Sequence, residues 1–174
     1  KDILNKTDTL KNHEVQAIYY FTRGMILMPQ GLFKEATVAD FIKALTLSKK
    51  TNSVYLIAVC YSALSKVYDY LRQFNYSIEN SKAFLAFASE TPVDTLILAK
   101  AYNNLGANYI NSGDKNTAAG YYKKFKQLVP YVHSPYLLWL SNNNKAHRLA
   151  EEGQNNDAIT YALRAIEIAK ANNL

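Results

Sequence analysis

Cysteine, glycine and proline are scarce in this 174-residue sequence, and each shortage excludes a class of fold. The single cysteine, Cys60, excludes a disulfide within the chain, and its apolar surroundings (LIAVCYSAL) predict a small buried side chain rather than a reactive thiol. Six glycines and four prolines argue against a turn-rich all-β fold. No run of 18 apolar residues is present, so we expect no membrane-spanning helix.

The sequence also lacks the patterns that carry enzyme chemistry. Its three histidines, His13, His133 and His147, show no metal-ligand or catalytic-triad spacing, and there is no glycine-rich phosphate loop or nucleophile motif. We therefore predict no catalytic activity, no metal and no cofactor. The net charge of +6 is spread along the chain without a dense basic block, which indicates a solvated surface rather than a nucleic-acid interface.

What the sequence does contain is a repeat of about 40 residues. The pattern YxxLxxxY at 61–68 recurs at 102–109, a shift of 41 residues. Shifts of 40 relate AxxxY at 118–122 to AxxxA at 158–162 and, more loosely, TxxxFxxA at 37–44 to SxxxSxxF at 77–84. The predicted organisation is a flanking segment or the end of a preceding repeat at 1–11, followed by four units at 12–52, 53–93, 94–134 and 135–174.

Each unit is predicted to form two helices. Apolar residues recur at i, i+3, i+4 and i+7 in both halves of a unit, and short breakers separate the halves. The expected helices span 12–28, 31–49, 53–72, 75–89, 94–112, 115–129, 135–152 and 155–172. We predict an all-α, right-handed superhelical solenoid of about four helical hairpins. Its core should include Tyr61, Leu64, Tyr68, Leu105, Gly106, Tyr109 and Ala118.

The third unit resembles the tetratricopeptide repeat. The residues that carry the resemblance are Tyr102, Leu105, Gly106 and Tyr109, followed by Gly113, Ala118, Tyr122 and Pro130. The units are longer than the 34 residues usual for that family, and they resemble long variants in bacterial sensor histidine kinases and transcriptional regulators. The resemblance implies a non-enzymatic module that binds a protein or an extended peptide, as the sensory or regulatory region of a larger bacterial signalling protein.

Two other functions stay open at this stage. A structural scaffold would use the solenoid for self-association or complex assembly, so a homo-oligomer is a second expectation. A peptide-pheromone-type regulator would have its DNA-binding part outside this chain. Because the sequence begins without Met and shows no signal peptide, we expect a piece excised from a larger cytoplasmic or periplasmic protein.

The units differ at two positions of the first helix. Where the third unit has Gly106, the second has Ser65 and the fourth has Ala146, and small residues there allow close helix approach. The fourth unit also places Lys145 where the third has Leu105, which leaves the register of that helix open.

Paired asparagines in the first helices of units three and four are the candidate ligand-binding residues. In the family that the third unit resembles, first helices line a concave groove, and positions off the buried stripe face into it. These positions give the candidate set Arg23, Ser62, Lys66, Lys100, Asn103, Asn104, Asn143, Asn144 and His147, with Tyr19, Thr22 and Ile26 beside Arg23. A carboxamide carries both donors and an acceptor, so it can pair with the backbone of an extended peptide. The alternative is that these asparagines are ordinary exposed residues of an Asn-rich chain.

Overall fold

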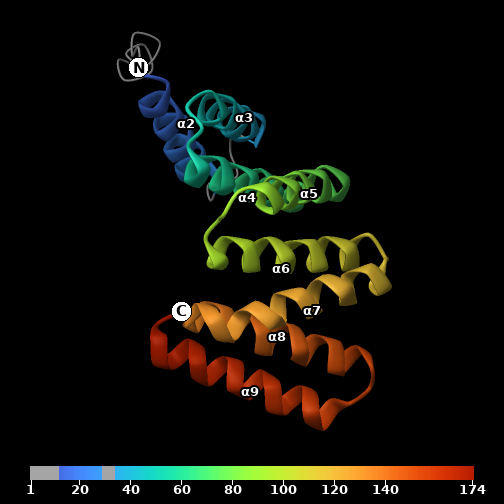
Figure 1. The fold of residues 1–174 in the computed structure, drawn as a ribbon. Helices are drawn as coiled ribbons and strands as arrows, with labels where there is room; N and C mark the ends of the chain where they lie inside the picture. Colours follow the sequence, from blue (N-terminus) through green and yellow to red (C-terminus); the bar gives the residue numbers. More distant parts are fainter. Residues whose placement is uncertain (1–11, 29–33) are drawn as a thin grey trace. The chain divides into compact units, whose positions relative to one another are not determined.

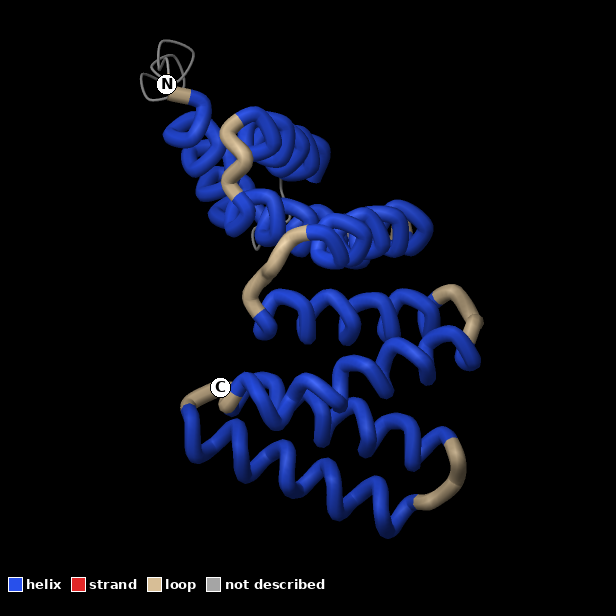
Figure 2. Tube along the Cα trace, in the orientation of Figure 1, coloured by secondary structure: helices blue, strands red, loops and turns tan. Residues whose placement is uncertain are grey.

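The computed structural model describes residues 12–28 and 34–174, and every regular element in these residues is an α-helix (Figures 1 and 2). The helices are α2 (His13–Leu27), α3 (Lys34–Lys50), α4 (Val54–Tyr70), α5 (Phe74–Glu90), α6 (Thr95–Asn111), α7 (Lys115–Val132), α8 (Pro135–Glu151) and α9 (Asn155–Asn172). They pair as hairpins, α2 with α3, α4 with α5, α6 with the start of α7, and α8 with α9. The predicted all-α fold of helical hairpins is confirmed, while the predicted flanking segment 1–11 lies outside the described residues.

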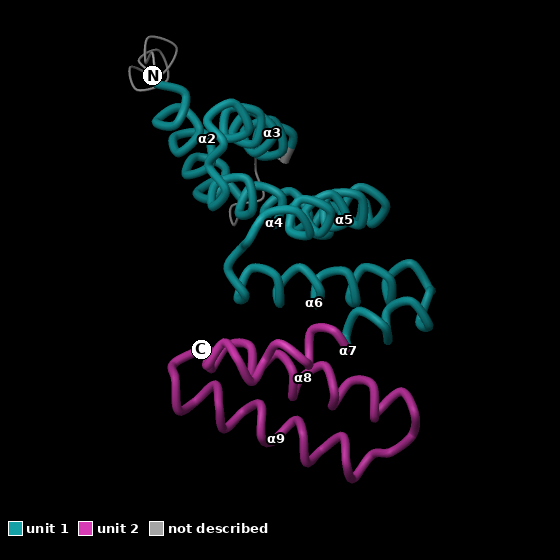
Figure 3. Tube along the Cα trace, in the orientation of Figure 1, with its two compact units in different colours: residues 1–122 teal, residues 123–174 magenta. Residues whose placement is uncertain are grey.

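The chain divides into two compact units, residues 1–122 (unit 1) and 123–174 (unit 2), with the boundary inside α7 (Figure 3). In unit 1 the first helix α4 contacts both α2 and α6, the first helices of the hairpins before and after it. The second helices α3 and α5 also contact the first helix that follows them in the chain. Unit 1 is therefore a row of stacked hairpins. The right-handed superhelical sense and the four-unit division stay predictions.

Three of the first helices, α2, α6 and α8, have a side-chain cap at their N-terminus. The Oδ1 atom of Asn12 accepts from the backbone N–H of Glu14 at 2.9 Å, and the Oδ1 atom of Asp94 accepts from that of Leu96 at 2.7 Å. Ser134 caps α8 in the same way. These oxygens satisfy N–H groups that have no partner inside the helix. The helices α2, α6 and α8 begin within one residue of the predicted positions, as do α4, α5 and α9, which have no side-chain cap.

The turns inside the hairpins use a left-handed backbone residue. Gly113 (φ 89°) between α6 and α7 and Gly153 (φ 76°) between α8 and α9 adopt it without a Cβ penalty. Arg72 occupies the same repeat position between α4 and α5 at φ 57°. This conformation costs a residue with a side chain roughly 1–2 kcal/mol. The two glycines lie in breakers recognised from the sequence, whereas the turn at Arg72 carries no such signal.

The predicted end of the sixth helix is wrong, and the predicted start of the second helix at 31 lies outside the described residues. The sixth predicted helix stops at 129, before Pro130, but α7 continues through the proline to Val132. Proline fixes φ near the helical value, but inside a helix it removes one backbone hydrogen bond and its ring crowds the carbonyl four residues earlier, so α7 ends within the same turn. The helix gives way to the left-handed backbone of His133, whose φ is 48°.

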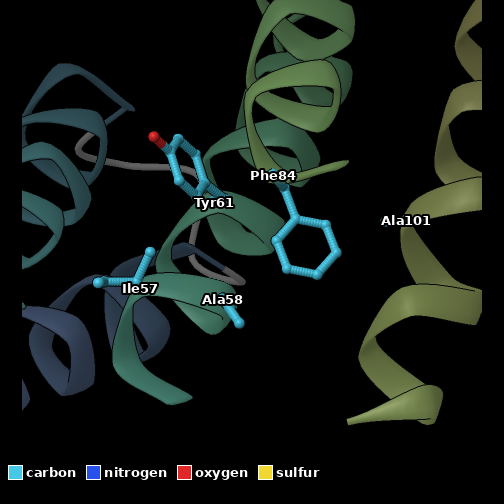
Figure 4. Close-up of a cluster of buried hydrophobic side chains, with 5 residues drawn as sticks. All are labelled: Ile57, Ala58, Tyr61, Phe84 and Ala101. Carbon is cyan, nitrogen blue, oxygen red and sulfur yellow. The ribbon is translucent and has the colours of Figure 1, made fainter. Parts of the chain in front are cut away.

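The core of unit 1 lies between the first and second helices. Figure 4 shows one part of it, where Phe84 of α5 lies between Ala58 and Tyr61 of α4 and Ala101 of α6. This cluster joins two successive hairpins. Burial of its apolar surface therefore stabilises the stacking of hairpins as well as each hairpin itself.

Five of the residues predicted for the core are buried, namely Tyr61, Leu64, Leu105, Gly106 and Ala118. The prediction is wrong for Tyr68 and Tyr109, which are only half-buried. Tyr68 packs on Tyr76 with ring centroids 5.2 Å apart, and Tyr109 stacks on Tyr121 at 5.5 Å. A tyrosine can bury its ring and keep its hydroxyl near water, so the edge of a core suits it.

Glycines allow close helix crossings in two hairpins. A Cβ atom on Gly24 of α2 would lie 2.7 Å from the ring of Phe41 in α3. A Cβ atom on Gly106 of α6 would lie 2.7 Å from the ring of Tyr122 in α7. Distances this short are forbidden by van der Waals repulsion, so both rings occupy space that only glycine leaves open.

Serines replace the glycine and the ring in the α4–α5 hairpin. The Oγ atom of Ser65 lies 2.6 Å from that of Ser81 and 3.0 Å from that of Ser77. Ser77 donates its proton to the Ser65 carbonyl oxygen at 2.6 Å, so Ser65 must donate to Ser77 and Ser81 to Ser65. Asn108 of α6 donates from Nδ2 to Ser77 Oγ at 2.7 Å. The four side chains form one buried network, which we call the serine–asparagine network.

The Gly24 crossing corrects the register predicted for the first unit. Because Gly24 aligns with Ser65, Arg23 aligns with the buried Leu64. The candidate positions Tyr19, Thr22, Arg23 and Ile26 were assigned from a register one residue out of step with the other units. The positions equivalent to the candidates on α6 are those of Ile18, Phe21, Thr22 and Met25.

Unit 2 consists of the end of α7 and the α8–α9 hairpin. Leu137 and Leu149 of α8 and Ala158 and Ala165 of α9 are buried. None of the helices in 12–28 and 34–174 has the length and apolarity needed to cross a membrane.

Candidate ligand-binding face of the first helices

One side of α4 carries an aromatic residue at each end and polar residues between them. Tyr55, Val59, Ser62, Lys66 and Tyr70 follow the spacing i, i+4, i+7, i+11 and i+15, which places them along one side of a helix. Tyr55 and Tyr70 are 65% and 60% exposed, Lys66 is exposed, and Ser62 is half-buried. This side of α4 therefore presents a hydroxyl and an ammonium group between two accessible rings. Tyr55 was missed in the sequence, although its spacing from Val59 places it here.

On the neighbouring α6, the two asparagines of the predicted pair have different surroundings. Asn104 is half-buried, and Lys100, one turn before it, is half-buried as well. Asn103 is only 8% exposed and has other interactions in the structure. The prediction that Asn103 lies off the buried stripe is therefore wrong. Asn104 is the amide of this pair that has accessible surface for a ligand.

An amide and a carboxylate link α4 to α6 beside these residues. Asn111 donates from Nδ2 to Asp69 Oδ1 at 3.4 Å, which ties the ends of the two helices together. Burial raises the pKa of Asp69 above its usual value, and the hydrogen bond from Asn111 opposes part of that shift. What we call the first-helix face consists of Tyr55, Ser62, Lys66, Asp69 and Tyr70 of α4 with Lys100 and Asn104 of α6. Asp69 adds an acid one turn from Lys66, so the face has both signs of charge.

Arg23 of α2 is used within its own hairpin. Its Nε donates to Asp40 Oδ2 of α3 at 2.6 Å, and its terminal nitrogen also pairs with the buried Asp40 carboxylate. Its guanidinium lies 5.4 Å from the ring centroid of Tyr19 and 5.2 Å from that of Tyr20. The hydrogen bond to Asp40 raises the pKa of Arg23 further. The charge of Arg23 is thus neutralised by Asp40, and the side chain braces the α2–α3 hairpin.

The remaining candidates lie on α8, in unit 2. Asn143 and Asn144 are half-buried, Asn144 has further interactions, and His147 is exposed. Their neighbour Lys145 places its Nζ 3.8 Å from the ring centroid of Tyr161 on α9. The hydrogen bond from Lys145 lowers the pKa of the Tyr161 phenol. Lys145 thus braces the α8–α9 hairpin at the position that Arg23 occupies in α2–α3.

Within the described residues no group of three or more His, Cys, Asp or Glu side chains could hold a metal ion. Cys60 is fully buried in α4, as predicted, and burial raises the pKa of its thiol to about 12. A thiol with that pKa is almost wholly protonated near neutral pH, so it is a poor nucleophile. The residues of the first-helix face instead offer hydrogen bonds, charge and ring surface, which are means of binding.

The geometry of unit 1, with paired helices stacked in a row, defines a helical-hairpin repeat. The tetratricopeptide repeat family model matches residues 99–128, which run from α6 into α7. The resemblance of the third unit is therefore confirmed over these residues. Repeats of this family typically mediate protein–protein interactions and are typically non-catalytic. No curated protein matches the chain significantly.

Proposed function

We propose that the chain is a protein-binding module and that its first-helix face holds an extended segment of a partner. The observation that carries the proposal is the tetratricopeptide match over the α6–α7 hairpin, next to accessible polar residues on α4 and α6. The first helix α4 contacts both α2 and α6, so the outward residues of these three helices belong to one continuous layer.

The chemistry of the first-helix face suits a peptide backbone with an acidic group. Asn104 can accept from a peptide N–H and donate to a peptide C=O. Lys66 and Lys100 attract a carboxylate, and Tyr55 and Tyr70 offer ring surface to apolar side chains. On α8, Asn143, Asn144 and His147 provide a second set of the same chemistry, used in the same way in unit 2.

The finer proposal is that this module is the sensory or regulatory region of a larger bacterial signalling protein. It rests on the resemblance of the 40-residue units to long repeats in sensor histidine kinases and transcriptional regulators. A scaffold for self-association is the second candidate, and exposed apolar stripes on α2 and α9 favour it. A peptide-pheromone-type regulator would use the same face for its peptide.

The test uses peptides selected from a random library displayed on phage, with binding then measured by calorimetry. Replacing Asn104 and Asn144 together by Ala should weaken binding by about 1–3 kcal/mol, because each lost hydrogen bond contributes roughly 0.5–1.5 kcal/mol. The melting temperature should stay the same or rise slightly, since Ala is the better helix former.

The matched control replaces Asn80 and Asn172, which lie on the second helices α5 and α9 and donate to the carbonyl four residues earlier. This control should leave affinity unchanged. Equal affinity in both double variants would contradict the role of the amides. A large loss of stability in the Asn104 and Asn144 variant would assign these residues to the fold instead.

A further inference from the structure

Three apolar side chains form an exposed stripe on α9. Ile159, Leu163 and Ile166 follow the spacing i, i+4 and i+7, so they share one side of the helix, and they are 58%, 54% and 48% exposed. We call Ile159 and Ile166, which flank Leu163 along the helix, the α9 stripe. Contiguous exposed apolar surface of this kind marks an interaction site.

The repeat positions of Ile159 and Ile166 are covered in the hairpins of unit 1, whereas that of Leu163 is exposed there, as Ile42 on α3 and Lys82 on α5. Val38 and Leu45 of α3 align with Ile159 and Ile166, and both pack against the cluster of α4 that contains Leu64. The equivalent residues of α5 are also buried or half-buried. At these positions, a second helix of unit 1 receives the first helix of the next hairpin.

α2 exposes the complementary side of a first helix. Val15 and Ile26, which we call the α2 stripe, are 44% and 59% exposed. They align with Leu56 and Val67 of α4, which are buried. Leu56 packs with Leu47 of α3, and Val67 belongs to a cluster that also includes α3 residues. The residues of the α2 stripe therefore occupy the repeat positions that α4 uses to pack on α3, the second helix before it.

We propose that a second copy of this chain docks head to tail, with its α2 stripe covering the α9 stripe of the first copy. The contact repeats between molecules the interface that α3 and α4 make within one molecule, so its residue types and spacing are already matched. This interface goes beyond the proposed peptide binding, because it uses other sides of other helices.

Charge supports the direction of docking. Only residues 51–53 separate α3 from α4, so a second helix ends beside the start of the next first helix. Docking of the same kind brings the last turn of α9, with Lys170, to the first turn of α2, with Glu14. The two side chains have opposite charge. Because the contact joins two different surfaces, it adds copies head to tail rather than pairing two copies symmetrically.

Sedimentation velocity of the 174-residue chain, from micromolar to millimolar concentration, tests the proposal. The average mass should rise with concentration. Ile166→Glu and Ile26→Glu each bury a carboxylate in the contact and should raise the dissociation constant about tenfold or more. Leu163→Glu is the matched control, since Ile42 at the same repeat position of α3 is 47% exposed although α4 packs on that helix. It should leave association unchanged.

A mixture of the two blocked variants separates head-to-tail docking from other arrangements. The Ile166→Glu chain still has a working α2 stripe, and the Ile26→Glu chain still has a working α9 stripe. Mixed in equal amounts, they should form dimers and nothing larger. Association that is lost in Ile166→Glu but intact in Ile26→Glu would instead indicate an α9–α9 pair and would overturn the proposal.

The ion pair gives a second test that leaves the apolar stripes intact. Glu14→Lys and Lys170→Glu should each weaken association about two- to fivefold at low salt, and the double variant should restore it. Circular dichroism confirms that each variant is folded. A wild-type chain that stays monomeric up to millimolar concentration, or a double variant weaker than both single ones, would overturn the proposal.

Discussion

The α2–α3 and α4–α5 hairpins cross at the same repeat position with opposite chemistry. In α2–α3, Gly24 faces the fully buried ring of Phe41. In α4–α5, Ser65 faces Ser81, and the two buried hydroxyls are hydrogen-bonded to each other. One crossing depends on an apolar fit of shapes, and the other depends on directional hydrogen bonds.

This difference shows that the space at the helix crossing is filled in both hairpins, although different residue types fill it. An aromatic ring requires a partner without a Cβ atom, because protein interiors are close-packed. Two serines need less room, and the amide of Asn108 enters from α6 to bond Ser77. The serine–asparagine network therefore links one hairpin to the next, whereas the contact between Gly24 and Phe41 lies within a single hairpin.

The largest expected effect comes from putting the ring of the first hairpin into the second. Ser81→Phe should destabilise the protein by about 2–4 kcal/mol, because overpacking against Ser65 adds to the loss of a buried hydrogen bond. Adding Ser65→Gly should recover part of this loss. Chemical denaturation followed by circular dichroism measures both variants. If the double variant is no more stable than Ser81→Phe, glycine is not what accommodates the ring.

A smaller loss should follow from removing the centre of the serine–asparagine network. Ser77→Ala leaves the buried amide of Asn108 without its acceptor, which should cost about 1–3 kcal/mol. Ser89→Ala on the same helix is the control, since Ser89 is exposed and bonds only within its own turn. Unfolding free energies of the two variants should differ clearly. Similar values would show that the network contributes little to stability.

The turns at Arg72 and Gly113 can be compared by exchanging residue types, and the change at Arg72 should increase stability. Arg72→Gly should stabilise the α4–α5 turn by about 1 kcal/mol, because glycine adopts the left-handed backbone without strain. The reciprocal change Gly113→Ala should cost a similar amount, since no atom lies near its Cβ position and only the backbone is affected. Thermal melting of both variants provides the check, and shifts of the same sign would contradict the explanation.

The smallest effect concerns Asp69 on the first-helix face. Its pKa is raised on folding, so the folded state binds the proton more tightly, and stability falls as pH rises through this shifted pKa. Asp69→Asn keeps the bond from Asn111 and should stabilise the protein at neutral pH by about 0.5 kcal/mol or less, because the group is half exposed. The advantage should vanish near pH 3, where both states carry a neutral side chain. A gain that persists there would contradict the explanation.

The helices and one crossing could be predicted because they depend on local spacing. Tyr102, Leu105 and Tyr109 recur at helical intervals, and Gly106 lies where a close approach is needed. The breakers at Gly113 and Gly153 mark turns by their own conformational freedom. These signals act over a few residues, so a single sequence contains them.

The features that were missed depend on partners distant in the sequence. Arg23 replaces a core leucine, and its purpose appears only with Asp40, which is 17 residues away. Asn103 has the same residue type as Asn104, and only its neighbours in space decide that it is buried. Asn108 bonds a serine 31 residues earlier, on another hairpin. The structure therefore removes Arg23 and Asn103 from the predicted set of binding residues, while the proposed face still lies on the first helices.

The central claim is that one repeat register runs through the hairpins, with Gly24 and Phe41 opposed as Ser65 and Ser81 are. A double-mutant cycle of Gly24→Ala and Phe41→Leu tests it most directly. Gly24→Ala alone should cost about 1–3 kcal/mol through overpacking. Gly120→Ala, at a helical glycine with open space, should gain up to about 1 kcal/mol through helix propensity.

In the Phe41→Leu background the ring is gone, and Gly24→Ala should become neutral or slightly stabilising. The predicted coupling between the two positions, measured by denaturant unfolding, is therefore at least about 1 kcal/mol. If the two substitutions are additive, Gly24 does not accommodate the Phe41 ring. The register that aligns the first-helix faces would then be contradicted.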